Sequence, residues 1–140
     1  MSFIQRKSYD VPTAGKIPAV LADFQERGER QTAFGIREEV RLVYFTDQLD
    51  SKKRPIQVMQ SLTRSLDERS NLFAVISGVL GGNVPDDGID PETLVGRQVT
   101  LEIEIVSGKR GPYAKVLNVA PGADGQNVAV PATFKRTKRS

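Results

Sequence analysis

The segment LVGRQVTLEIEIVSGKRGPYAKVLNVAPG, residues 94–122, holds two apolar–polar runs around a short turn with glycine at each end. Over residues 99–105, apolar side chains alternate with threonine and glutamate, which is the period of a strand with one buried face. The turn SGKRG follows, and apolar side chains return over residues 113–119. The segment therefore predicts an antiparallel hairpin whose tip carries Lys109 and Arg110.

Further strands are expected before this hairpin. Residues 39–46, EVRLVYFT, are rich in β-branched and aromatic side chains and give the strongest strand signal in the chain. Residues 16–27 carry an apolar run that ends in a charged turn at Gly28, and residues 55–66 alternate apolar with polar side chains. The polar residues 28–38 are expected to form the loop between the first two of these strands.

The period changes to that of a helix between the third and fourth expected strands. Residues 72–80 place apolar side chains at the spacing of one helix face. Ser65 with Glu68 fits a capping box, and the glycines at 81–82 fit a C-terminal cap. The pattern predicts one helix over residues 67–80.

The order of elements is thus strand, strand, strand, helix, strand, strand. An OB-fold, a five-stranded barrel that binds oligonucleotides, matches this order, and a sandwich or open sheet with one helix fits it too. We predict a mainly β, OB-fold-like five-stranded barrel with one α-helix between strands three and four, as a single domain over residues 1–122. Residues 123–140, rich in glycine, alanine and polar side chains, are expected to be a disordered basic tail.

The chain contains no histidine and no cysteine. This removes the commonest general base, the commonest metal ligand, thiolate metal sites and disulfides, so we expect a non-enzymatic protein without metal or cofactor. No apolar run approaches the ~20 residues that a membrane helix needs. The start MSFIQRKSYD has no apolar signal region. A cytoplasmic protein without membrane contact is therefore expected.

The positive net charge is concentrated at the C-terminus. The chain has twenty lysines and arginines against seventeen acidic residues, and four of the cations are Lys135, Arg136, Lys138 and Arg139. The rest of the chain holds sixteen cations against seventeen acids. Any anion-binding site in the folded domain must therefore be a local patch, while the tail adds salt-sensitive, non-specific attraction to phosphate.

In an OB-fold, ligands lie across the second and third strands, between the loops joining strands one to two and four to five. If Val40, Leu42 and Tyr44 face the core, then Arg41 and Phe45 lie on the outer face. Single-stranded nucleic acid is bound by such a cation for phosphate and such a ring for stacking. The alternative is that Tyr44 and Phe45 are both core, because a bent strand can bury both faces.

The other candidates are cations and apolar side chains of the neighbouring strands and turns. Rings would stack bases and cations would hold phosphates. The glutamates interleaved with arginines in residues 28–38 weaken that segment, because cross-turn pairs would neutralise the cations. The turn at 52–54 is either a solvated turn or, with the other basic turns, one side of a groove. The complete candidate set is Phe34, Arg37, Arg41, Phe45, Lys52, Lys53, Arg54, Met59, Lys109, Arg110, Tyr113 and Lys115.

Three segments, SLTRSLDERSNLFAVISGVLGG (61–82), DPETLVGRQVTLEIEI (90–105) and YAKVLNVAP (113–121), are similar to a group of small phage and prophage proteins. The resemblance spans about residues 16–122. It implies an OB-like, phage-type accessory protein of replication or recombination that binds single strands. The family supplies no agreed binding residues.

The sequence thus favours a protein that binds single-stranded DNA without sequence preference, with RNA as an alternative polymer. The other hypothesis is an OB-like module that binds a replication or recombination protein by a groove or a strand edge. The near-neutral body favours this second hypothesis, and the basic turns oppose it. The oligomeric state stays open, a homodimer included.

Overall fold

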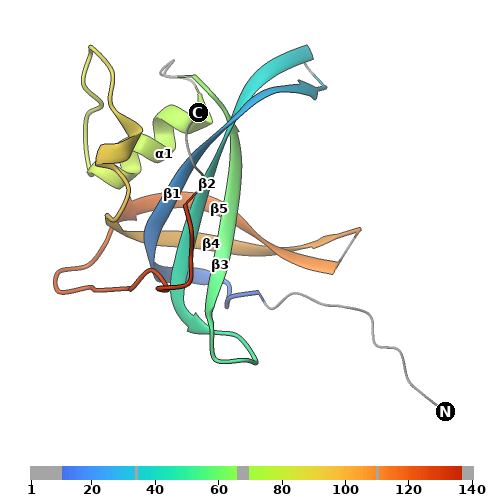
Figure 1. Cartoon of the computed structure of the whole chain (residues 1–140), viewed down its shortest axis with the longest axis vertical. Helices are drawn as coiled ribbons and strands as arrows, with labels where there is room; N and C mark the ends of the chain where they lie inside the picture. Colours follow the sequence, from blue (N-terminus) through green and yellow to red (C-terminus); the bar gives the residue numbers. More distant parts are fainter. Residues whose placement is uncertain (1–10, 34, 66–69, 110, 137–140) are drawn as a thin grey trace.

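The computed structural model describes residues 11–33, 35–65, 70–109 and 111–136, which form one antiparallel sheet and one α-helix (Figure 1). The strands are β1 (Gly15–Thr32), β2 (Gly35–Leu49), β3 (Pro55–Thr63), β4 (Gln98–Gly108) and β5 (Gly111–Pro121), and the helix is α1 (Asn71–Leu80). The prediction of a mainly β chain with its helix between strands three and four is confirmed. Nowhere in these residues is a helix long and apolar enough to cross a membrane.

The strands lie in the order β3-β2-β1-β4-β5, and each neighbouring pair is antiparallel. β1 therefore lies at the centre, and β3 and β5 form the two edges. α1 contacts both of these edge strands. Among the described residues β3 and β5 do not pair with each other, so the sheet does not close into the expected barrel.

The main core lies between the sheet and α1. One face of each strand supplies it, as the alternation predicts, and α1 adds Leu72, Val75, Ile76 and Val79. Its largest fully buried side chains include Tyr44, Leu21, Leu42, Ile76 and Leu101. The core therefore fixes which side chains of β2 and β3 point outward.

The helix begins later than the sequence suggested. Ser70 is its N-cap, because its Oγ accepts a hydrogen bond from the Phe73 amide at 3.1 Å. The same hydroxyl donates to the Ser65 carbonyl at 2.8 Å. Ser65 is thus wrong as the cap, and Glu68 lies outside the described residues. The C-terminal cap is confirmed, since Gly81 adopts a left-handed φ of 73°.

The expected loop at residues 28–38 is a paired hairpin instead. Residues 28–32 of β1 and 35–39 of β2, here called the arm, continue the sheet past the core and project from the body (Figure 1). A register shift before Gly28, whose φ is 74°, marks where the arm begins. Most of its side chains are exposed on both faces, so no apolar alternation announces these strands.

Residues 123–136, here called the strap, follow β5 and cross the outer face of β1 and β2 (Figure 1). At the start of the strap, Gln126 Nε2 donates to the carbonyl oxygens of Ala19 at 3.0 Å and Val99 at 2.9 Å. The prediction of a disordered tail over residues 123–140 is therefore wrong for the strap. Residues 137–140 lie outside the described residues. Contacts more than a hundred residues apart in sequence hold it.

The strap covers a second, smaller apolar cluster. This cluster lies on the outer face of the sheet and consists of Val20, Ala22, Val43 and Phe45. Val128 and Phe134 pack against it, and the ring of Phe134 meets that of Phe45 edge to face, with centroids 5.0 Å apart. The strap is therefore a packed part of the domain.

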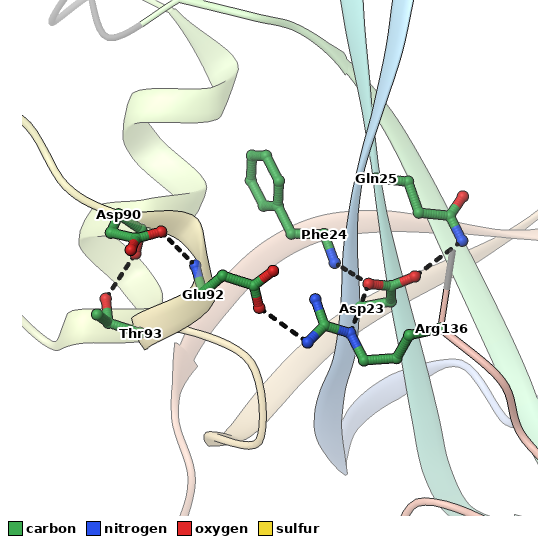
Figure 2. Close-up of polar contacts among 7 residues, drawn as sticks. All are labelled: Asp23, Phe24, Gln25, Asp90, Glu92, Thr93 and Arg136. Atoms are coloured by element: carbon green, nitrogen blue, oxygen red, sulfur yellow. Dashed lines mark hydrogen bonds and ion pairs between the residues drawn. The ribbon is translucent and has the colours of Figure 1, made fainter. Parts of the chain in front are cut away.

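An ion pair fastens the end of the strap (Figure 2). The fully buried Asp23 carboxylate accepts hydrogen bonds from the Phe24 amide at 2.9 Å and from Gln25 Nε2 at 3.1 Å. Arg136 Nε donates to the same carboxylate at 2.9 Å, and Arg136 Nη1 lies 2.8 Å from Glu92 Oε2. Hydrogen bonds to Glu92 and then to Asp23 raise the pKa of Arg136 above its usual value, so its charge is secure.

Candidate nucleic-acid interface

Like charges face each other across the arm. Arg30 is the cross-strand partner of Arg37, and Glu29 is that of Glu38. Cross-strand partners share a face and successive residues alternate, so the arginines lie on one face and the glutamates on the other. The prediction that arginines and glutamates pair across this turn and neutralise each other is therefore wrong for these cross-strand partners. Arg30 escaped the sequence candidates because its place depends on the hairpin register.

The arginine face, defined as Arg30, Arg37 and Arg41, runs from the arm to the body. Arg41 lies four residues after Arg37 on β2 and shares its side of the strand. Glu39 lies between them on this side, so cations outnumber acids by three to one among these residues. On β3, Ser61 is the cross-strand partner of Arg41. The arginine face therefore leads to β3.

A cleft of about 510 Å³ lies between the edge strands β3 and β5, and Ser61 is on its wall. Met59 from β3 and Tyr113 and Lys115 from β5 also line it, so the structure brings these sequence candidates together. The exposed fraction is 52% for Met59 and 50% for Tyr113. Other lining residues are Gln60, Leu62, Asn71, Ala74, Val75, Ala114, Val116, Leu117, Asn118 and Val119. The cleft has apolar walls with amide and hydroxyl groups among them.

The ring of Tyr113 is held against the β4–β5 hairpin. A Cβ atom at Gly108 would lie 3.0 Å from two carbon atoms of this ring, so the ring packs directly over the glycine. The rest of the side chain is open to solvent, as its exposure shows. Lys109, next to this glycine at the hairpin tip, is exposed, and Lys115 is exposed two residues along β5. The hairpin thus presents a positioned ring between cations.

The basic turn between β2 and β3 lies at the other end of β2 from the arm (Figure 1). Asp50 organises it by accepting from the amides of Lys52 at 2.8 Å and Arg54 at 2.9 Å. The hydrogen bonds from these two amides lower the pKa of Asp50, and the bond from the Arg54 amide has the largest effect. Arg54 Nε also pairs with Asp50 at 3.2 Å, while Lys52 and Lys53 are exposed. This basic turn and the arm therefore lie at opposite ends of β2.

Phe45 is not available as a stacking ring. It does point to the outer face, as the alternation predicted, but it is only 7% exposed because Phe134 of the strap covers it. The alternative in which Tyr44 and Phe45 are both buried is therefore the correct one. The remaining candidates, Phe34 and Arg110, lie outside the described residues.

The chain matches no protein-family model, and a search of curated proteins finds no significant match. The arginine face, the cleft and the β4–β5 hairpin are therefore the features from which a function can be argued.

Proposed function

We propose that this protein binds single-stranded DNA with little sequence preference, on a fold of the OB type that is left open between β3 and β5. The strand order β3-β2-β1-β4-β5 is that of a five-stranded barrel cut once, and α1 lies beside the cut. An accessory role in replication or recombination, which the resemblance in sequence to small phage and prophage proteins implies, is part of this proposal.

The observation that carries the proposal is the pairing of Arg30 with Arg37. Like charges directly opposite each other destabilise a hairpin, and a bound anion would relieve their repulsion. Arg41 continues the same face toward the cleft. A phosphodiester backbone is an anion of the right shape, because its charges repeat along a line.

The cleft and hairpin favour a single strand over a duplex. The exposed ring of Tyr113 can stack on any unpaired base, at about 1–3 kcal/mol per base, whereas a duplex hides the faces of its bases. Met59 lines the same cleft, and Lys109 and Lys115 lie on the same hairpin for neighbouring phosphates. Stacking with backbone contacts gives affinity without a sequence code.

We expect Arg37→Ala with Arg41→Ala to weaken oligo-dT binding at least about tenfold, and to reduce the steepness of its salt dependence by about 1.4, or about 0.7 per lost phosphate contact. Lys52→Ala with Lys53→Ala is the matched control, because it removes the same charge from the far turn. Fluorescence anisotropy at several salt concentrations measures both, with duplex DNA and oligo-rU alongside. Equal losses in the two double variants would show general attraction and contradict a local site.

A second candidate function is the binding of a protein partner through a β-strand. The unpaired edges of β3 and β5 favour it, since open edges are templates for an added strand. If the wild-type protein binds no oligonucleotide at low salt, this function replaces the first.

A further inference from the structure

The two faces of the arm carry opposite charges. Arg30 and Arg37 lie on one face, and Glu29 and Glu38, which are also cross-strand partners, lie on the other. Among the described residues no ion pair joins a glutamate of the arm to an arginine, so the arm does not neutralise its own charges. Like charges directly opposite each other destabilise a hairpin, and both pairs do so here. The arrangement therefore points to a role outside the fold.

Both charged faces are open to solvent along the length of the arm. Glu29, Arg30, Arg37 and Glu38 are exposed, and the arm projects from the body beyond the core (Figure 1). Five residues of an antiparallel strand extend about 17 Å, which is the length of about five base steps of a duplex. A strand of DNA can therefore lie along either face for several nucleotides.

An apolar side chain is exposed near the tip of the arm. Ile36 is 59% exposed and belongs to neither apolar cluster of the described residues. As the cross-strand partner of Gln31, it lies on the glutamate face. Isoleucine is one of the side chains that proteins insert between stacked base pairs. Ile36 is therefore placed to meet the last base pair of a duplex when the arm enters between two strands.

We propose that the arm separates the two strands of DNA at a junction between single strand and duplex. One strand lies along the arginine face, the glutamate face repels the complementary strand, and Ile36 packs on the terminal base pair. This inference goes beyond the proposed single-strand binding and rests on it, because the binding of one strand supplies the free energy that opens the pairs.

The charges of the arm fit this position better than the major groove of an intact duplex. That groove admits a two-stranded ribbon, but the glutamates would then lie between two phosphate backbones. Single-strand binding alone does not need these glutamates either, since they repel phosphate in general. A repulsive group is useful where one form of a partner must be rejected, and here that form is the second strand.

The test uses a duplex that has one single-stranded dT tail, with a fluorophore and a quencher on the base pairs next to the tail. At saturating protein and low salt, wild type is expected to open these pairs and raise the fluorescence. Glu29→Gln with Glu38→Gln keeps the arginine face, so it is expected to bind oligo-dT at least as tightly as wild type. Its equilibrium constant for opening is expected to be roughly threefold lower, a modest change because exposed charges act weakly through water. Ile36→Ala is also expected to lower this constant.

Asp86→Asn with Asp87→Asn is the matched control, because it removes the same charge from an exposed loop outside the arm. Its equilibrium constant for opening is expected to equal that of wild type. At high salt the difference between the glutamate variant and wild type is expected to vanish, since salt screens exposed charges.

An opening constant that falls in the glutamate variant and holds in the control supports the inference. An unchanged constant in the glutamate variant overturns it, and so does wild type that binds the tailed duplex without opening it. Single-strand binding stands in both of these cases. If wild type binds neither the tailed duplex nor oligo-dT at low salt, the proposed function fails and the inference fails with it.

Discussion

Replacing Arg136 by alanine is expected to lower the free energy of unfolding by roughly 3 kcal/mol. The reason lies in its partner, because the Asp23 carboxylate has no exposure to solvent. Removing one partner of a buried pair takes a counter-charge away from a carboxylate that solvent does not reach, which costs about 3–5 kcal/mol. The lower end applies here, since the Phe24 amide and Gln25 Nε2 still donate to this carboxylate.

Urea unfolding of Arg136→Ala measures the effect, and Lys135→Ala is the matched control. Lys135 is an exposed cation of the same strap, so its loss is expected to change stability by less than about 0.5 kcal/mol. Asp23→Asn combined with Arg136→Ala completes a double-mutant cycle, and a coupling of at least about 1 kcal/mol is expected. Equal urea midpoints for Arg136→Ala and Lys135→Ala would contradict a structural role for the strap.

This result decides how the basic C-terminus can be tested for DNA binding. A chain ending at Gly122 would lose the cation opposite Asp23 and would uncover Val43 and Phe45. Weaker binding by that chain would then report a damaged domain rather than a missing phosphate contact. Lys135→Ala separates the two, because it removes charge from the strap and leaves the packed residues in place.

The order of strands and the helix could be predicted because their signals are local. Alternation over residues 99–105 and the helical spacing of residues 72–80 both follow from one face packing against the same core. The helix start was missed because Ser65 and Ser70 both precede the apolar run. Ser70 is the cap without a glutamate at the third helical position, where Phe73 stands.

The arm and the strap could not be predicted because neither builds the main core. The arm has no buried face, so its sequence carries no strand period. The strap is held by single side chains, Gln126, Phe134 and Arg136, whose partners on β1 and β2 lie far away in sequence. Its composition alone resembles a disordered tail.

The candidate site was predictable in part for the same reason. Met59, Tyr113 and Lys115 were found from alternation and turn chemistry, and the cleft joins them. Arg30 was missed, because its place beside Arg37 depends on the register of a polar hairpin. The alternation placed Phe45 on the correct face of the sheet. It could not show that Phe134 of the strap covers the ring.

Gly78→Ala is expected to destabilise the protein by about 2–3 kcal/mol, although alanine is the better helix former by about 1 kcal/mol. A Cβ atom at this position of α1 would lie 2.0 Å from the carbonyl oxygen of Val119 in β5. That oxygen is backbone in a paired strand, so it cannot swing away as a side-chain end could. The helix must instead move off β5 and give up core contacts, and this loss outweighs the gain in helix propensity.

Gly82→Ala is the control for this substitution, because a Cβ atom there would meet nothing within 4 Å. Its thermal midpoint is expected to match wild type, whereas that of Gly78→Ala is expected to fall by roughly 5–10 °C. A stable Gly78→Ala protein would mean that α1 does not sit on β5 as described. Since Ala74 and Val75 of the same helix line the cleft, a shift of α1 away from β5 would also change the shape of the cleft.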